Sequence, residues 1–283
     1  MQRRDFLIGL PAFAGLQRVL AGDARLKAGC QANGFALRQG DWSGFLSALE
    51  EMKRLGYTGC ESNVRFIAGE FGRTAGARRE IQLTGIQYIG AHTSLEGTNP
   101  ETFKTTAAGV AAIGGLSIVM SARGLSPAGN FERAALENKA EQLNAMGRIC
   151  REQGIRLAYH NHNPEFANGN AEIDGLAAAT DGTLVDFLID AGHAYLGGGN
   201  PAKFMLEHSG RIFGCHLKTF RNGDVKQQVP LGQGDFDFQQ LAAAVKKTNW
   251  TGWLITEEGG GPTPGNTGAL ASDRAYIRKM FGV

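Results

Sequence analysis

The sequence predicts an α/β protein built as a single closed (β/α)8 barrel. Three observations support this prediction. Short apolar segments alternate with longer amphipathic segments from residue 27 onward, eight of the short segments have the character of strands, and 283 residues suit the roughly 250 residues of an eight-stranded barrel. No linker or second domain interrupts the alternation, so residues 22–283 are expected to form one domain.

The expected strands are short and rich in aliphatic and aromatic side chains. They span Lys27–Asn33, Tyr57–Asn63, Ile86–His92, Leu116–Ala122, Ile155–His162, Leu184–Gly192, Ile212–Lys218 and Gly252–Glu257. Segments with apolar residues at three- and four-residue spacing lie between them, most clearly at Trp42–Leu55, Phe131–Gln153 and Phe236–Thr248. Gly56, Gly154 and Gly252 precede the next strands, where glycine takes the left-handed conformation that ends a helix.

An open nucleotide-binding sheet is the alternative arrangement for alternating strands and helices. That sheet requires a glycine fingerprint after the first strand, but residues 31–35 read Gln-Ala-Asn-Gly-Phe. The runs Gly197–Gly199 and Gly259–Gly261 lack the spacing that cradles a pyrophosphate, and the sequence has no Gly-Lys-Ser/Thr loop. Nucleotide cofactors are therefore not expected.

The first 21 residues have the features of a twin-arginine export signal. Arginines at positions 3 and 4 precede the apolar stretch Phe6–Leu16, and the small residues Val19 and Ala21 stand before the expected cleavage point. The apolar stretch is shorter than the ~20 residues of a membrane-spanning helix. An amphipathic helix is the alternative for residues 1–21. We expect a periplasmic protein that is exported folded and keeps no stable membrane insertion.

Removal of this signal leaves a chain without net charge. The full sequence has 29 Lys and Arg against 27 Asp and Glu, and the first 21 residues contain three arginines and one aspartate, which leaves 26 of each sign. Nucleic-acid binding depends on clustered basic side chains, so a nucleic-acid partner is not expected. A small-molecule partner is favoured, and the sequence leaves a homo-oligomer open.

Candidate metal ligands end the last four strands of the predicted barrel. In such barrels the functional groups come from the carboxyl ends of the strands, and His160, Asp190, His216 and Glu257 all lie there. Each residue alone has an ordinary explanation, as a hydrogen-bonded histidine or a helix cap. Their arrival at successive strand ends favours one shared divalent metal. Imidazole and carboxylate ligands suit Mn²⁺, Co²⁺, Zn²⁺ or Mg²⁺ better than Ca²⁺.

The cysteines are not expected to bind this metal. Cys30, Cys60 and Cys215 each precede a residue assigned to the barrel mouth, so by strand alternation their side chains point outward beneath the helices. Cys150 lies in a predicted helix. We expect buried thiols, with a Cys30–Cys60 disulfide as the alternative in an oxidising periplasm.

From about Lys27 to the carboxyl terminus, the chain resembles the sugar isomerase/epimerase superfamily of xylose-isomerase-like TIM barrels. The most specific motifs are Tyr-His-Asn-His-x-x-Glu-Phe at 159–166, Asp-x-x-His at 190–193, His-Leu-Lys at 216–218 and Leu-Gly-Gln-Gly-Asp-Phe-Asp-Phe at 231–238. The resemblance implies a single divalent metal, with Mn²⁺ as first choice, held by Glu, Asp, His and Glu of strands five to eight. Asp190, His216 and Glu257 match that set, whereas His160 replaces its first glutamate.

This replacement bears on the reaction. In the resembling epimerases the two glutamates act as a pair, one removing a proton and the other returning one, and this chain keeps only Glu257. His160 is either a metal ligand or a free general base, because imidazole titrates near neutrality. His162 or Glu165 is expected to fill the role that His160 does not.

Other polar residues at or just after strand ends are candidates for binding a sugar: Glu61, His92, His162, Glu165 and His193. Glu61 and His92 end strands two and three and either bind sugar hydroxyls or form hydrogen bonds at the rim. The resemblance places a substrate-binding or metal-shell histidine at His193. Lys218 shares a face with His216 and is assigned to a developing oxyanion, with a salt-bridged lysine as the alternative.

Together these residues predict a metal-dependent enzyme that acts on a sugar. A divalent metal bound to a carbonyl and the neighbouring hydroxyl makes the adjacent C–H bond acidic, which gives access to an enediolate. The first hypothesis is an isomerase or epimerase with Glu257 and His160 as acid/base groups. The alternative is a lyase or dehydratase acting on a 3-keto sugar, keto-glycoside or inosose. A non-catalytic sugar-binding barrel is a more distant alternative.

Overall fold

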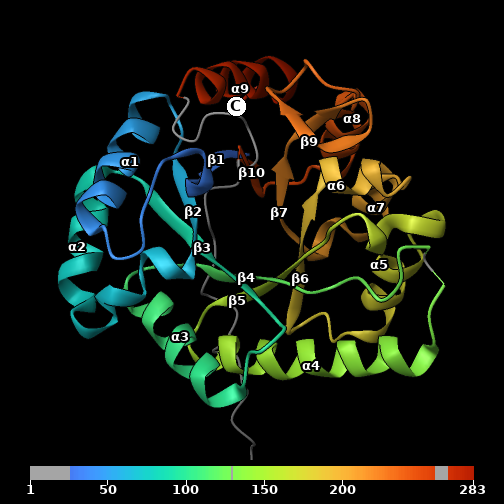
Figure 1. Ribbon diagram of the computed structural model, residues 1–283, viewed down its shortest axis with the longest axis horizontal. Helices are drawn as coiled ribbons and strands as arrows, with labels where there is room; N and C mark the ends of the chain where they lie inside the picture. The colour runs from blue at the N-terminus through green and yellow to red at the C-terminus, as the bar shows by residue number, and fades with distance from the viewer. Residues whose placement is uncertain (1–25, 129, 259–266) are drawn as a thin grey trace, which may run out of the picture.

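In the computed structural model, parallel strands close into a barrel that helices surround (Figure 1). The model describes residues 26–128, 130–258 and 267–283. Within these residues the barrel has eight strands: β1 (Lys27–Gln31), β2 (Gly59–Asn63), β3 (Gln87–Ser94), β4 (Ser117–Ser121), β5 (Arg156–His160), β6 (Val185–Asp190), β7 (Ile212–Leu217) and β10 (Trp253–Thr256). Their order around the barrel is β1-β10-β7-β6-β5-β4-β3-β2. The predicted (β/α)8 barrel is thus confirmed.

The helices pack against their neighbours in chain order and cover the outside of the barrel (Figure 1). They are α1 (Trp42–Arg54), α2 (Thr74–Thr84), α3 (Pro100–Ala112), α4 (Arg133–Glu152), α5 (Ala167–Ala179), α6 (Ala191–Leu196), α7 (Pro201–His208), α8 (Gln239–Thr248) and α9 (Thr267–Phe281). The amphipathic segments predicted from apolar spacing correspond to α1, α4 and α8.

Two of the three predicted glycine helix stops are confirmed. Gly56 and Gly154 have φ angles of +89° and +72°. The prediction for Gly252 was wrong, because Asn249, with φ of +51°, ends α8 instead. Gly252 is required for a different reason: a Cβ atom there would lie 2.0 Å from Cζ2 of Trp250.

Apolar side chains occupy the interior of the barrel below the carboxyl ends of its strands. The interior cluster consists of Ile89, Val119, Ala158, Leu188, Phe213, Trp253 and Ile255. The indole of Trp253 crosses to β2, where a Cβ atom on Gly59 would lie 2.5 Å from Cζ3 of that ring. Trp253 therefore packs in the core. This core lies beneath the carboxyl ends of the strands, where the functional groups of such barrels gather.

All four cysteines of the chain lie among the described residues and are buried free thiols. Cys30, Cys60 and Cys215 belong to the core between barrel and helices rather than to the barrel interior. The predicted outward direction is confirmed. Cys30 and Cys60 are register partners on β1 and β2, and no disulfide joins them. Burial raises the pKa of each of these thiols.

One element within the described chain was not predicted. An antiparallel hairpin, β8 (Thr219–Arg221) with β9 (Asp224–Val229), follows β7 at the mouth of the barrel. Its turn places Asn222 and Gly223 at φ angles of +57° and +62°. Asn-Gly at these two positions is a strong signal for a hairpin turn.

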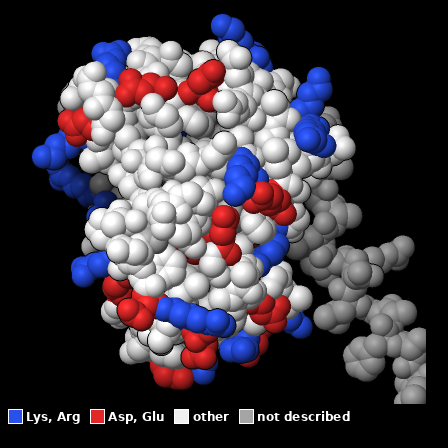
Figure 2. Space-filling model, turned by 90° about the vertical axis from the view of Figure 1, so that its right-hand side faces the viewer, with Lys and Arg blue, Asp and Glu red and all other residues white. Residues whose placement is uncertain are grey.

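Two further sequence expectations concern the ends and the surface of the molecule. The expected export signal, residues 1–21, lies outside the described residues. Of the helices in the described part of the chain, none has the length and apolar character that crossing a membrane requires. On the face shown in Figure 2, basic and acidic side chains are interspersed, and the described residues form no continuous basic patch there.

Candidate metal centre

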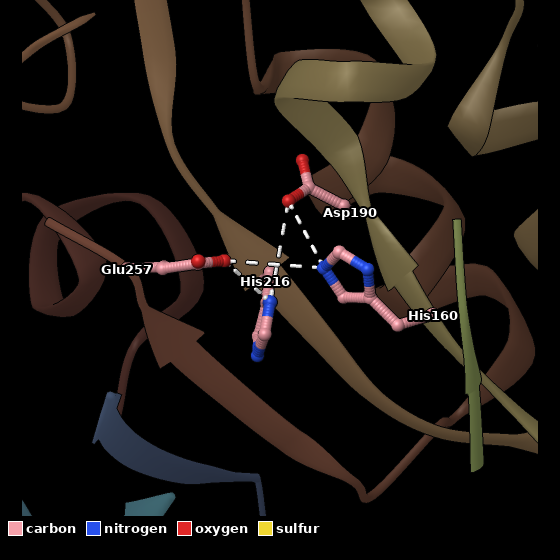
Figure 3. Close-up of side chains that lie close together, drawn as sticks. All are labelled: His160, Asp190, His216 and Glu257. Atoms are coloured by element: carbon pink, nitrogen blue, oxygen red, sulfur yellow. Dashed lines mark ion pairs between the residues drawn. The ribbon is translucent and has the colours of Figure 1, made fainter. Parts of the chain in front are cut away.

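Four side chains from neighbouring strands converge at the barrel mouth. His160 ends β5, Asp190 ends β6, His216 lies in β7, and Glu257 directly follows β10. One ligand atom of each lies within 4.8 Å of the others, and all four residues are buried (Figure 3). We call these four residues the cage. They are the residues for which the sequence predicts a shared metal.

The cage atoms have ion contacts but no hydrogen bonds of standard geometry. Nε2 of His160, Oδ2 of Asp190, Nδ1 of His216 and Oε2 of Glu257 are all buried and unpaired by hydrogen-bond geometry. Nε2 of His160 lies 3.4 Å from Oδ2 of Asp190 and 3.9 Å from Oε2 of Glu257. Leaving a buried polar atom unpaired costs about 1–3 kcal/mol. One cation among these atoms would satisfy all of them, so the donor set fits a divalent metal.

Asp190 is held in place by two neighbours and still offers one oxygen to the cage. Its Oδ1 accepts a hydrogen bond of 2.8 Å from the backbone N–H of His193 and so caps α6. Asn161 accepts from the backbone N–H of Asp190 at 2.9 Å and donates to its carbonyl at 3.2 Å. Oδ2 is left facing the cage. Asn161 was not predicted, because strand alternation directs it away from the mouth.

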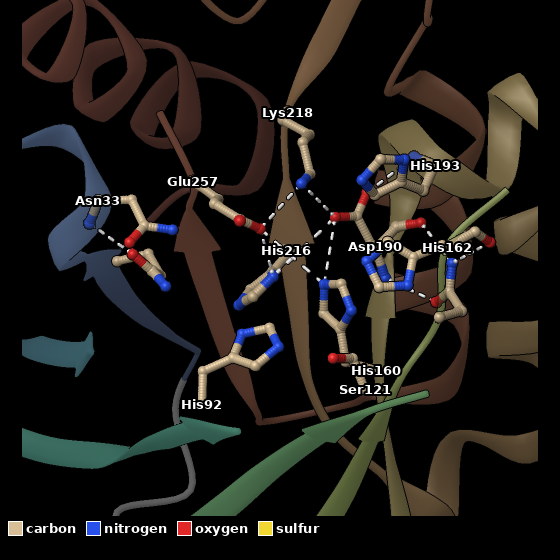
Figure 4. Close-up of polar contacts among 12 residues, drawn as sticks. Asn33, His92, Ser121, His160, His162, Asp190, His193, His216, Lys218 and Glu257 are labelled. Carbon is tan, nitrogen blue, oxygen red and sulfur yellow. Dashed lines mark hydrogen bonds and ion pairs between the residues drawn. The ribbon is translucent and has the colours of Figure 1, made fainter. Parts of the chain in front are cut away.

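Lys218 provides a positive charge at the cage. Its Nζ atom lies 2.9 Å from Oδ2 of Asp190 and 3.0 Å from Oε2 of Glu257 (Figure 4). Burial lowers the pKa of Lys218, but the two carboxylates outweigh it and raise the pKa above the ordinary value. Burial raises the pKa of both carboxyls, and Lys218 is the largest opposing cause that holds each below its ordinary value. Lys218 is thus salt-bridged in this structure and lies close to the cage.

The two cage histidines differ in protonation. Burial, reinforced by His216 and His92, lowers the pKa of His160 to about 3, so this imidazole is neutral at physiological pH. Burial also lowers the pKa of His216, but Glu61 and Glu257 outweigh it and raise the pKa to about 10. His160 therefore carries a free lone pair that can bind a metal or accept a proton.

Three further histidines surround the cage. The ring centroid of His92 lies 5.0 Å from that of His160. The ring of His162 lies 5.1 Å from those of His160 and His193. Nδ1 of His193 is 2.6 Å from Oδ1 of Asn163, and burial foremost lowers the pKa of His193 to about 4. These rings lie beside the cage (Figure 4).

Glu165, an expected substrate-binding residue, has other partners. Its side chain is fully buried, and Tyr159 donates its hydroxyl to Oε1 at 2.6 Å. The backbone N–H of His162 donates to Oε2 at 3.2 Å. Lys139 lies 3.8 Å from Oε1 and 2.6 Å from Glu172. Glu165 therefore anchors the loop after β5, and this placement differs from the expected contact with sugar.

Glu61 forms a hydrogen bond at the rim, the alternative that the sequence left open beside sugar binding. The side chain is fully buried, with Oε2 2.9 Å from Nε2 of His216 and Oε1 3.6 Å from Nδ1 of His92. Burial raises the pKa of Glu61, but His216 and His92 outweigh it and lower the pKa to about 2. Glu61 is thus ionised and contacts the cage from behind His216.

The unpredicted hairpin contributes to the site. Gln228 of β9 donates its side-chain amide to the carbonyl of Glu257 at 2.5 Å. The ring of Phe220 in β8 lies 5.8 Å from that of His193. The hairpin therefore supports both the last cage residue and the surrounding histidines.

Comparisons with known proteins agree with this architecture. The family model of the xylose isomerase-like TIM barrel matches residues 49–280. An inosose dehydratase from Clostridium beijerinckii is 27% identical over 274 residues, which cover 84% of this chain and 90% of that protein. One from Clostridium tetani is 30% identical over 194 residues, covering 59% of this chain and 65% of that protein.

Solved structures share the fold at low sequence identity. A sugar phosphate isomerase/epimerase from Parabacteroides distasonis superposes with a TM-score of 0.70 at 19% identity, covering 95% of this chain and 98% of that one. This likeness concerns the fold. Together with the family match over most of the sequence, it supports one assignment: the chain belongs to the xylose isomerase-like TIM barrel family.

Proposed function

We propose that this protein is a divalent-metal-dependent carbon–oxygen lyase that eliminates water or an alcohol from a keto sugar, keto-glycoside or inosose. The observation that carries the proposal is His160 in the cage, which leaves Glu257 as the one carboxylate suited to moving a proton from carbon to a departing oxygen. The relatives named inosose dehydratase support an elimination. We propose Mn²⁺ as the metal, held by His160, Asp190, His216 and Glu257.

The residues of the site can carry an elimination with one acid/base group. When bound, the cation supplies Lewis acidity that polarises the substrate carbonyl and acidifies the neighbouring C–H bond. Glu257 is ionised, so it can accept the proton from that carbon. The electrons of the C–H bond form a C=C bond as the β-C–O bond breaks. Glu257 then returns its proton to the departing oxygen, which leaves as water or an alcohol.

The surrounding residues have supporting roles in this proposal. Lys218 places an ammonium group beside the cage, where it can stabilise the oxygen that becomes negative. His92, His162 and His193 offer ring nitrogens to sugar hydroxyls. Asp190, which caps α6 and has a lowered pKa, remains a ligand rather than a base.

An isomerase or epimerase is the second candidate, and the neutral state of His160 favours it. Burial lowers the pKa of His160 to about 3, so its imidazole can accept a proton as a second base beside Glu257. This reaction needs His160 free of the metal. The lyase proposal needs His160 only as a ligand.

One experiment separates the two reactions. The Mn²⁺-loaded protein is incubated in D₂O with an inosose, a 3-keto-glucoside and a free ketose, and the products are followed by NMR. We expect an unsaturated ketone together with released water or aglycone. Recovery of a deuterium-labelled epimer without an elimination product would instead establish the epimerase. Absence of both deuterium and product from every substrate would contradict proton abstraction altogether.

We further propose that the protein acts in the periplasm, on the basis of the arginine pair and apolar stretch within residues 1–21. Replacing Arg3 and Arg4 together by lysine should retain the chain in the cytoplasmic fraction. Unchanged export of that double variant would contradict the twin-arginine route.

A further inference from the structure

A contact across the barrel mouth joins a residue outside the cage to a cage histidine. Nε2 of His216 in β7 lies 2.9 Å from Oε2 of Glu61 in β2. Strands β2 and β7 are not neighbours, because β1 and β10 lie between them in the barrel. Both side chains are fully buried. The hydrogen bond between Glu61 and His216 therefore spans two intervening strands and is shielded from water.

The backbone of β2 directs Glu61 toward that partner. Glu61 lies two residues after Gly59, which faces the interior residue Trp253, so strand alternation directs Glu61 into the barrel as well. The pairing of β2 with β3 skips Ile89 of β3. Glu61 then pairs with Gly90, which has no side chain on the neighbouring strand. Cys60 packs in the outer core while Glu61 points into the barrel mouth.

The contact determines which nitrogen of His216 faces the cage. A carboxylate only accepts hydrogen bonds, so the nitrogen beside Glu61 must carry a hydrogen. That nitrogen is Nε2. The other nitrogen, Nδ1, lies 2.7 Å from Oε2 of Glu257 and 4.0 Å from Oδ2 of Asp190, inside the cage. By the same reasoning Nδ1 carries a hydrogen toward Glu257 while no cation is bound. A metal would take the place of this hydrogen, because a metal-binding imidazole is neutral, whereas the hydrogen on Nε2 stays with Glu61. A histidine that binds a metal usually donates its second ring N–H to a partner of this kind.

We infer that Glu61 is a positioning residue that holds His216 with Nε2–H toward β2 and Nδ1 toward the metal. The inference does not depend on whether the reaction is an elimination or an epimerisation. It also replaces the expected role of Glu61 at sugar hydroxyls, since its Oε2 is engaged by His216 and the side chain is shielded from solvent.

The test measures metal affinity in Glu61→Gln, which keeps the shape of the side chain and removes its charge. Mn²⁺ affinity is determined by competition with a chromophoric chelator. We expect a loss of about 10- to 100-fold, as for other outer partners of metal-binding histidines. Glu172→Gln is the matched control, because Glu172 is an equally buried carboxylate that pairs with Lys139 away from the cage. Its Mn²⁺ affinity should stay within threefold of the unmodified protein.

A second measurement reports the ring itself. NMR of the ¹⁵N-histidine-labelled, Zn²⁺-loaded protein should show His216 with hydrogen on Nε2 and metal on Nδ1. Glu61→Gln should weaken or exchange-broaden that Nε2–H signal, whereas Glu172→Gln should preserve it. Metal bound through Nε2 in the unmodified protein would overturn the inference. An affinity loss of equal size in both variants, or none in Glu61→Gln, would also overturn it.

Discussion

Nε2 of His160 lies 3.4 Å from Oδ2 of Asp190, and both atoms are buried without a hydrogen bond of standard geometry, although Lys218 forms an ion pair with that oxygen. A cation between them removes this deficit, so His160→Ala should weaken Mn²⁺ binding at least about tenfold. The measurement is metal content per chain after dialysis at graded free Mn²⁺ concentrations.

His162→Ala is the control for this variant, because His162 lies beside the cage without contributing to it. It should keep the Mn²⁺ affinity of the unmodified protein. Unchanged affinity in His160→Ala would show that His160 is not a ligand and would leave it free to act as the base.

His160→Glu tests the link between this position and the reaction. The change restores the pair of carboxylates that the resembling epimerases use, so a second group capable of accepting and returning a proton faces Glu257. We expect the ratio of deuterium-labelled epimer to elimination product to rise at least about tenfold, a difference of about 1.4 kcal/mol between the two barriers. Product NMR in D₂O gives this ratio directly.

His160→Gln is the appropriate comparison, since it has a similar size and cannot act as a base. It should not increase the share of epimer. The same product ratio in His160→Glu and His160→Gln would show that the residue at position 160 does not determine which reaction occurs.

Lys218→Met should destabilise the protein more strongly without metal than with it. The variant leaves the carboxylates of Asp190 and Glu257 buried without the ammonium group that lies 2.9 Å and 3.0 Å from them. Removing one partner of a buried ion pair costs about 3–5 kcal/mol. A bound cation supplies replacement charge, so the loss in the free energy of unfolding should be smaller in Mn²⁺ than in EDTA.

Urea unfolding in both solutions measures this difference. Lys104→Met is the surface control, because its ion pair with Glu101 is exposed and such pairs contribute about 0–1 kcal/mol. Equal losses for Lys218→Met in Mn²⁺ and in EDTA would mean that the lysine and the metal do not share the same carboxylates.

The fold was predictable because its signals are local. Alternating apolar and amphipathic segments report which side of each element is buried, and the glycines at 56 and 154 end helices in the predicted way. The hairpin also had a local signal, the pair Asn222-Gly223, but the sequence analysis did not predict a turn there. The error at Gly252 had another origin. A side chain at that position would collide with the ring of Trp250, so glycine is needed there for space rather than to end a helix.

The cage was predictable for a geometric reason, whereas its surroundings were not. Parallel strands in a closed barrel bring their carboxyl ends together, so residue types at those ends suffice to propose a site. The partners of Glu61 and Glu165 depend on which side chains meet across the barrel or beneath a loop. Strand periodicity carries no information about such contacts, and sugar-binding roles were therefore predicted for both.

A buried acid pair outside the cage predicts a pH-dependent stability. Asp273 in α9 is fully buried beside Glu258. Burial first, and Glu258 second, raise the pKa of Asp273 from 3.8 to about 9. The folded protein therefore keeps a proton that the unfolded chain releases near pH 4. The stabilisation is complete below that pH and is lost as the pH rises toward 9, by at most about 1.4 kcal/mol per pH unit.

Asp273→Asn should flatten this profile. In the unmodified protein Asp273 accepts a hydrogen bond of 2.7 Å from the backbone N–H of Leu231. The asparagine side chain keeps an oxygen that can accept this bond, and its amide does not ionise in this pH range. Urea unfolding at pH 5, 7 and 9 should show the variant gaining stability relative to the unmodified protein as the pH rises. Asp224→Asn, at a partly exposed hairpin residue with a lowered pKa, should give no such gain. Parallel profiles for Asp273→Asn and the unmodified protein would show that Asp273 is ionised in the folded state, because only a retained proton produces the difference.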